Sequence, residues 1–176
     1  SGILLIAKRR CALVKLWDQF RARETGKTCL ALVRGEWSER LKVIDVALHK
    51  YLLEDGERRV RAVEADHPEA MRSISLVRVA RRLPGMTLLE VTIKTGRTHQ
   101  IRVHLATQGH PIVGDDKYGD FEHNRSLRRA GGLRRMFLHA WRLRLSHPAS
   151  GEALEWTSAL PADLSDFLDS LQSPGM

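Results

Sequence analysis

The sequence predicts an α+β fold, with a mostly antiparallel mixed sheet and flanking helices. Segments in which apolar and polar residues alternate occur at 74–82, 86–94, 137–146 and 152–159, and this period of two is typical of half-buried strands. Turn residues such as Pro84-Gly85 separate neighbouring segments, so the strands are expected to pair as hairpins. Segments with a helical period are few, which argues against alternating βαβ units.

The first three elements are predicted in the first 35 residues. Residues 3–7 are five apolar residues in a row, which indicates a short buried strand. A helix is predicted over 9–24, because apolar residues recur there at helical spacing (Leu13, Leu16, Trp17 and Phe20). Gly26 ends this helix, and residues 27–33 are expected to form the next strand.

The remaining elements follow from turn residues and periodicity. The polar stretch 36–72 is expected to hold short strands and loops, and the hairpin at 74–94 comes next. A helix is predicted over 98–108, where Gly109 and Pro111 close it. After the last hairpin, residues 161–171 are expected to form a terminal helix.

Composition limits the classes of protein that the chain can represent. Its 176 residues predict one domain, and no apolar run approaches the roughly 18 residues of a membrane span. The net charge is +8, with a pI near 10.1. This excess favours a polyanion such as nucleic acid, although a generically basic protein would show it too. Two cysteines cannot form a disulfide framework, which fits a reducing cytoplasm.

The basic charge is concentrated near the C-terminal third of the chain. Between 121 and 146 there is one acid, Glu122, and there are seven arginines (Arg125, Arg128, Arg129, Arg134, Arg135, Arg142 and Arg144). The guanidinium group matches phosphate geometry, and Gly131-Gly132 would let an arm over 124–135 flex. We expect this arm to contact RNA or DNA, and the alternative is a solvated basic loop.

The densest cluster of polar residues lies at 94–119, "KTGRTHQIRVHLATQGHPIVGDDKYG". Thr95-Gly96 predicts a tight turn from a strand into a helix, and five polar residues follow it (Arg97, Thr98, His99, Gln100 and Arg102). A helix N-terminus with added guanidinium groups favours a phosphate or a carboxylate. His99 and His104 are five residues apart, not the four that place two metal ligands on one helix face. Asp115-Asp116 is more typical of a turn than of a metal site.

The segment "TGRTHQIRVHLATQGHPIVGDDKYG" closely resembles the third signature of the RluA-type pseudouridine synthase family. "KTCLALVRGEW" is similar to the second signature, and "RRMFLHAWRLRLSHPASGE" to the C-terminal core strands. With the arginine-rich arm, the chain most resembles members that act on large-subunit ribosomal RNA. The resemblance runs from Ser1 to about Leu164.

This resemblance implies residue roles and a reaction. Arg102 matches the arginine that pairs with a nucleophilic aspartate, and Leu138 matches an apolar residue of the pocket. Cys29 stands where the family usually has a tyrosine. Arg97, His99 and Gln100, together with Thr98, would contact phosphates or a flipped nucleotide around the helix end. The reaction isomerises uridine to pseudouridine, and it implies no redox cofactor and no metal.

The opening "SGILLIAK" resembles the end of the first signature, whose aspartate would then lie upstream of Ser1. We therefore expect 1–176 to be the C-terminal portion of a catalytic domain, inactive by itself, acting as a cytoplasmic monomer on large-subunit ribosomal RNA. One alternative is an RNA-binding module without catalysis. A weaker alternative is a metal- or histidine-dependent nuclease built on His99, His104 and Asp115.

Overall fold

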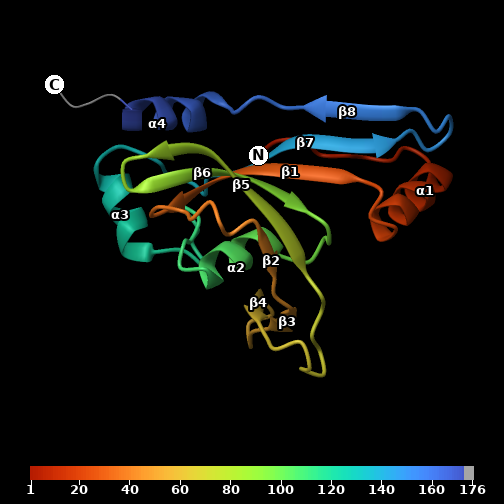
Figure 1. Cartoon of the computed structure of the whole chain (residues 1–176), viewed down its shortest axis with the longest axis horizontal. Coiled ribbons are helices and arrows are strands. Elements are labelled where there is room, and N and C mark those ends of the chain that lie inside the picture. The colour runs from red at the N-terminus through yellow and green to blue at the C-terminus, as the bar shows by residue number, and fades with distance from the viewer. Residues whose placement is uncertain (173–176) are drawn as a thin grey trace.

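The computed structural model describes residues 1–172. The helices are α1 (Arg10–Arg21), α2 (Gln100–Thr107), α3 (Phe121–Arg129) and α4 (Ala162–Gln172), and the strands are β1 (Gly26–Arg34), β2 (Val43–Asp45), β3 (Leu48–Leu52), β4 (Arg58–Ala62), β5 (Ile74–Leu83), β6 (Met86–Ile93), β7 (Leu138–Ser146) and β8 (Ala153–Thr157). Six strands form one sheet in the order β2-β5-β6-β1-β7-β8, and all neighbours are antiparallel. Strands β3 and β4 form a separate hairpin (Figure 1). The α+β prediction is confirmed.

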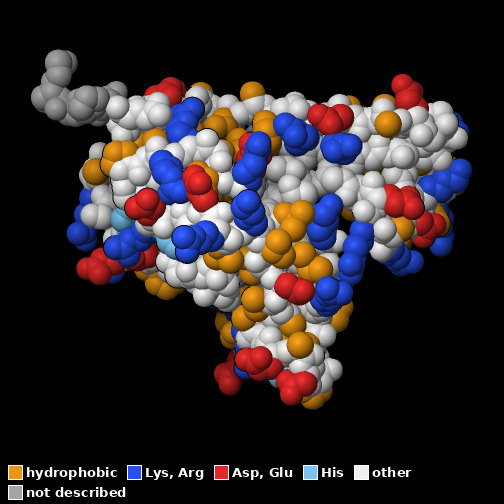
Figure 2. Space-filling model, viewed as in Figure 1, with side chains coloured by type: hydrophobic (Ala, Val, Ile, Leu, Met, Phe, Trp, Pro, Cys, Tyr) orange, Lys and Arg blue, Asp and Glu red, His pale blue; other side chains and the backbone are white. Residues whose placement is uncertain are grey.

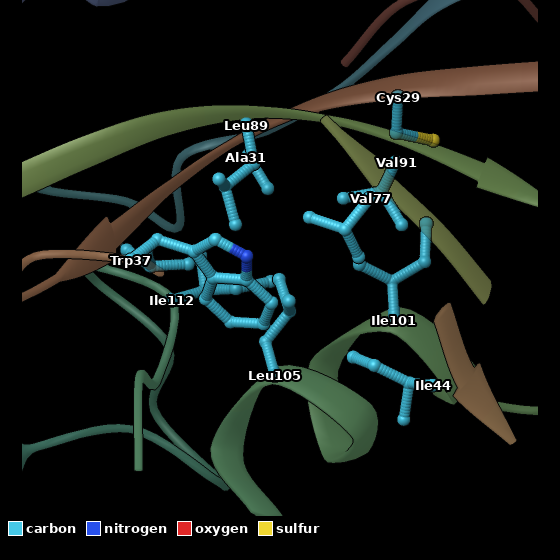
Figure 3. Close-up of a cluster of buried hydrophobic side chains, with 11 residues drawn as sticks. Cys29, Ala31, Trp37, Ile44, Val77, Leu89, Val91, Ile101, Leu105 and Ile112 are labelled. Carbon is cyan, nitrogen blue, oxygen red and sulfur yellow. The ribbon is translucent and has the colours of Figure 1, made fainter. Parts of the chain in front are cut away.

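The two faces of the sheet carry separate hydrophobic clusters, because side chains alternate along each strand. On β1, Cys29 and Ala31 face a cluster completed by Ile101 and Leu105 of α2 (Figure 3). Leu32 belongs to the other cluster, which α4 covers with three side chains (Leu164, Phe167 and Leu168). Figure 1 shows α2 and α4 on opposite sides of the sheet. Strand β1 is therefore buried on both faces, as its apolar sequence predicts.

The β3–β4 hairpin projects from the sheet beside α2 (Figure 1). It packs through Leu48 and Val60 against Val103 of α2, with Tyr118 at the edge of this small cluster. The hairpin falls within the stretch where short strands and loops were expected. The hairpin also lies beside residues 96–98, the turn that precedes α2.

The predicted strand over residues 3–7 is wrong. Only Gly2 bridges β7, and Leu4 and Ile6 are 81% and 73% exposed. The reason is that β7 is paired on both sides from Arg142 onward, with β1 and with β8, so no free edge continues beside residues 4–7. Ile3 and Ala7 still pack against the cluster that contains Leu16 of α1.

The predicted flexible arm over 124–135 is also wrong in its first half, because residues up to Arg129 form α3. The Asp120 side chain accepts a hydrogen bond from the His123 amide and caps the helix N-terminus. Gly131 follows the helix with a φ of +73°, and Leu133 is buried in the core. The other predicted helices and hairpins are confirmed with boundaries shifted by a few residues. No helix among residues 1–172 has the length and apolar character needed to cross a membrane.

Candidate active site

Three parts of the chain that lie far apart in the sequence meet at Ala140 of β7. The backbone of Ser1 and Ile3 is hydrogen-bonded to Ala140, at 2.8 and 2.9 Å, and Gly2 forms a parallel bridge with it. On the neighbouring strand, Cys29 is the register partner of Ala140. Gly2 has a φ of +109°, and a Cβ there would lie 2.2 Å from the Ala140 carbonyl oxygen. Only glycine therefore lets the start of the chain lie this close to β7.

Side chains and backbone of β7 hold Ser1 in place. The Ser1 amine donates to the Leu138 carbonyl at 3.3 Å, and the Ser1 hydroxyl lies 2.9 Å from Nδ1 of His139. His139 is buried and its Nε2 donates to the Ser158 carbonyl, so Nδ1 is the acceptor for the hydroxyl. Arg135 donates to the same hydroxyl oxygen at 3.3 Å. Leu138 thus lies between the chain start and the cluster that contains Cys29.

The Cys29 thiol is 5% exposed and packs with Val91 and Ile101. Burial raises the pKa of Cys29, and the amines of Lys27 and Ser1 offset part of this rise. The thiol is therefore protonated near neutral pH and is a poor proton acceptor. Cys29 supplies neither the ring nor the hydroxyl of a tyrosine.

Arg102 is held by a carboxylate of this chain, Asp115. Its Nε and Nη2 donate to the two Asp115 oxygens at 2.8 and 2.7 Å, a bidentate pair. The Arg102 guanidinium also lies 5.0 Å from the centre of the Tyr118 ring. The hydrogen bond to Asp115 raises the pKa of Arg102. Among residues 1–172 the Arg102 Nη1 atom makes no hydrogen bond, so one end of the fork is open to another partner.

Asp115 is 1% exposed and also forms the turn expected at this position. Its Oδ1 accepts from the amides of Lys117 and Tyr118 at 2.9 and 3.0 Å. Burial alone would raise the pKa of Asp115, but the bonds from Arg102 and these amides outweigh it and lower the pKa. Its pairing with Arg102 was missed in the sequence, where Asp115-Asp116 indicated only a turn.

His99 occupies the N-cap position of α2 in a left-handed conformation, with a φ of +51°, and its side chain makes no capping hydrogen bond. The Tyr118 hydroxyl accepts from the Val60 amide at 3.0 Å and lies 2.8 Å from Nδ1 of His99. Tyr118 thereby links the Val60 amide to the ring of His99. Burial and the nearby charges of Arg102 and Lys117 lower the pKa of His99. Tyr118, which sequence reasoning missed, therefore contacts both His99 and Arg102 and positions them side by side.

Gln100 and His104 have their polar atoms bonded inside the protein. The Gln100 side chain is 3% exposed, accepts from Thr95, and donates to the carbonyl of Ile74 and the hydroxyl of Ser75. Gln100 therefore has no free polar side-chain atom with which to make the predicted contact with RNA. These bonds join the turn before α2 to β5 and position the residues on either side.

His104 belongs to the same network and is fully buried. Its Nε2 donates to the Val46 carbonyl at 2.8 Å, and its Nδ1 lies 2.8 Å from the Ser75 hydroxyl. Burial lowers the pKa of His104. Within residues 1–172, no group of three or more His, Cys, Asp or Glu could hold a metal ion. The polar side-chain atoms of His104 and Asp115, two of the three residues of the nuclease alternative, are thus already bonded inside the protein.

Arg97 and Thr98 remain accessible at the start of α2. They line a cavity of about 440 Å³ between this turn and β3, together with His49. Arg97 donates from Nε to the Arg72 carbonyl at 3.1 Å, and its amide donates to Gln100. The helix N-terminus and the guanidinium group both favour an anion here.

The arginines of the basic stretch divide into free and paired groups. Four of them are exposed and make no ion pair with any residue from 1 to 172 (Arg125, Arg128, Arg129 and Arg134). Arg135 forms a bidentate pair with Asp163, and Arg142 and Arg144 lie 3.8 and 3.3 Å from Glu155. The buried Asn124 accepts from the Gly114 amide and donates to the Asp115 carbonyl, both at 2.8 Å. Helix α3 is thereby tied to the turn that holds Arg102.

The antiparallel sheet thus carries a buried arginine–aspartate pair, and helix α3 beside that pair carries arginines that make no ion pair with residues 1–172. Residues 1–107 match the sequence model of a family described as RNA pseudouridylate synthase. The chain belongs to this family.

Curated relatives and solved structures agree with this assignment. The chain is 44% identical over 172 residues to "Ribosomal large subunit pseudouridine synthase C" of Haemophilus influenzae, and 42% identical over 174 residues to the protein of that name from Escherichia coli K12. These matches cover 98% of this chain but 52% and 53% of the relatives, so the chain spans about half their length.

Two human structures share the fold. "Human RNA Pseudouridylate Synthase Domain Containing 4" superposes with a TM-score of 0.71 at 24% identity, covering 93% of this chain and 69% of that one. "Human RNA Pseudouridylate Synthase Domain Containing 1" gives 0.69 at 25% identity, covering 96% and 74%.

Proposed function

We propose that residues 1–176 are the C-terminal portion of a catalytic domain that converts uridines of large-subunit ribosomal RNA to pseudouridine. The observation that carries the proposal is the meeting of the signature segments at Ala140, where Ser1–Ile3 and Cys29 both join β7. The names of the curated relatives support the choice of ribosomal RNA as substrate. We further propose that the protein works as a monomer in the cytoplasm.

The proposed reaction breaks the bond between the uracil nitrogen and the sugar, rotates the base and rejoins it through carbon. An aspartate in sequence preceding Ser1 would be the nucleophile. Ser1 is bonded to Leu138 and Arg135, so residues joined to it would begin beside the proposed pocket. No metal takes part in the proposed chemistry.

The side chains of this chain would serve binding and electrostatics. A carboxylate near a guanidinium stays ionised, and the open Nη1 of Arg102 can supply that interaction while Asp115 holds the other atoms of the fork. Leu138 would contact the base. Arg97, Thr98 and His99 would bind phosphates or the flipped nucleotide, since removing a base from a duplex costs a few kcal/mol that flanking contacts must offset.

The test compares this chain with a chain extended upstream through the expected aspartate. Both are incubated with a large-subunit ribosomal RNA transcript labelled with tritium at uracil C5, because forming the new carbon–carbon bond releases that hydrogen. We expect release only with the extended chain, and none after its aspartate is replaced by asparagine. Turnover by residues 1–176 alone would place the nucleophile elsewhere.

The competing function is an RNA-binding module without catalysis, and Cys29 is the observation that favours it. The buried thiol cannot stack on a base or accept a proton readily. RNA binding by the extended chain without any tritium release would support this alternative and reject the enzyme.

A further inference from the structure

Strand β4 of the projecting hairpin is bonded to residues 115–118, the turn beside the start of α2. The Val60 amide donates to the Tyr118 hydroxyl at 3.0 Å, and Nη1 of Arg59 donates to the Lys117 carbonyl at 3.2 Å. The Arg59 guanidinium also lies 5.9 Å from the centre of the Tyr118 ring. The hairpin and this turn are therefore joined through both backbone and side chains.

The far end of the hairpin has the wrong charge for a contact with phosphates. Its turn, 53–57, carries Glu54, Asp55 and Glu57 and no basic residue. The part of the molecule that projects downward in Figure 2, which holds the hairpin, also ends in acidic side chains. Because carboxylates repel a polyanion, the hairpin is better placed to act on the site through its bonds to the 115–118 turn.

Tyr118 connects β4 to two residues of the candidate active site. Its hydroxyl lies 2.8 Å from Nδ1 of His99, and its ring centre lies 5.0 Å from the Arg102 guanidinium. A cation is attracted to the face of an aromatic ring, so the ring and Asp115 both restrict where the guanidinium can lie. One half-buried side chain thus fixes His99 and Arg102 with respect to the hairpin.

We propose that Tyr118 is a positioning residue for the reaction, which holds His99 and Arg102 in register with the β3–β4 hairpin. Its hydroxyl orients the His99 ring toward the bound nucleotide, and its ring steadies the guanidinium that pairs with the nucleophile. Tyr118 acts through these two residues and not by touching the substrate. The proposal rests on the proposed function for the identity of the reaction.

Steady-state tritium release by the extended chain separates the two contacts. Tyr118→Phe keeps the ring and removes the hydroxyl, so we expect KM to rise about fivefold while kcat changes by less than about twofold. Tyr118→Leu removes the ring as well, and we expect kcat to fall about tenfold in addition. Tyr51→Phe, which changes the other tyrosine of the chain, is the matched control. Thermal unfolding checks that each variant is folded.

A double-mutant cycle distinguishes positioning from a general loss of structure. Asparagine tolerates the left-handed backbone found at residue 99, so His99→Asn removes the ring without straining the turn. Because the hydroxyl acts through His99, Tyr118→Phe should raise KM no further in the His99→Asn background. An equal rise of KM in both backgrounds would overturn the proposal, since the loss would then come from the unpaired Val60 amide.

The ring nitrogen chemical shifts of His99 in residues 1–176 give a readout that needs no turnover. The hydrogen bond at one ring nitrogen selects the tautomer of a histidine, so Tyr118→Phe should move both His99 nitrogen shifts toward those of an unbonded ring. The shifts of His139, which is bonded to Ser158, should stay unchanged. Spectra of His99→Asn identify the His99 signals.

Unchanged His99 shifts in Tyr118→Phe would overturn the proposal, because the hydroxyl would then not orient the ring. Failure of the extended chain to isomerise RNA would instead reject the proposed function. The nitrogen shifts would in that case still decide whether Tyr118 holds His99.

Discussion

Asp115 illustrates how one side chain at the centre of the site serves both structure and electrostatics. It accepts two backbone amides to form its turn and two guanidinium donors from Arg102. Because Asp115 is buried and both of its carboxylate oxygens are bonded, it holds Arg102 in a defined orientation before any substrate binds. The turn that Asp115 forms also requires Gly119, because a Cβ there would lie 2.2 Å from the backbone carbonyl oxygen of Asp115.

The first residue-scale prediction concerns Cys29. In the extended chain, Cys29→Tyr should raise turnover about tenfold, because a ring and a hydroxyl replace a buried thiol whose pKa is raised. Cys29→Ala should cost little activity. Initial rates of tritium release give the comparison, and thermal unfolding checks that the larger ring is accommodated beside Ile101.

The opposite pattern would reject this reasoning. If Cys29→Ala abolished turnover and Cys29→Tyr failed to restore it, the thiol would be a working catalytic group. Unchanged rates in both variants would show that this position takes no part in the reaction.

At the residue scale, the sequence predicted candidate site residues but not how their side chains pair. The residue types at the helix start predicted only an anion site, and the resemblance to the family gave Arg102 and His99 their expected roles. Tyr118 was missed, because nothing in the local sequence indicates that its hydroxyl contacts both the Val60 amide and His99. Val60 precedes Tyr118 by 58 residues. Gln100 was predicted to face RNA, and only the fold reveals that Ile74 and Ser75 take its donors.

Helix α3 is the element whose form could least be predicted. Its sequence "FEHNRSLRR" is polar and arginine-rich, so it lacks the apolar period that predicts a helix. The available signal was Asp120, an N-cap residue, followed by Glu122 in the first turn and arginines in the last turn, where each charge favours the helix dipole. Because Arg125, Arg128 and Arg129 are spaced by three and four residues, the helix presents them on one side.

The element-scale prediction concerns two arginines on that side of α3, Arg128 and Arg129. Replacing both Arg128 and Arg129 by alanine should weaken RNA binding and lower its salt slope by about 1.4 for a single strand, since each lost phosphate contact accounts for about 0.7. Both side chains are exposed and free of ion pairs with residues 1–172, so folding should be little affected. Binding isotherms at several salt concentrations give the slope.

A charge-matched control separates local contact from total charge. Arg40→Ala combined with Arg81→Ala removes two exposed arginines that lie outside α3. An equal loss of slope in this control would mean that α3 contributes only to the overall positive field.

At the scale of the whole molecule, the buried His104 and the half-buried His99 couple stability to pH. The pKa of His99 and of His104 is lowered in the fold, chiefly by burial. The unfolded chain therefore binds more protons than the fold as the pH falls through the ordinary histidine pKa of about 6.5. Asp115, whose pKa is also lowered, stabilises the fold above the ordinary aspartate pKa of about 3.9 and loses this effect only below it.

We therefore expect the free energy of unfolding to decrease as the pH falls from about 7.5 to about 5. His104→Asn should reduce this dependence, because an amide can donate to Val46 and accept from Ser75 without titrating. Urea denaturation at each pH measures the effect. His147→Asn removes an exposed histidine and should leave the dependence unchanged, whereas equal slopes for both variants would mean that the buried network does not set it.

The seating of Ser1 against β7 has a practical consequence for handling the protein. The Ser1 amine and carbonyl are bonded to Leu138 and Ala140, and Gly2 leaves no room for a side chain. Any sequence joined directly to Ser1 would therefore begin beside Leu138 and β7. Labels for the binding measurements therefore belong on the oligonucleotide.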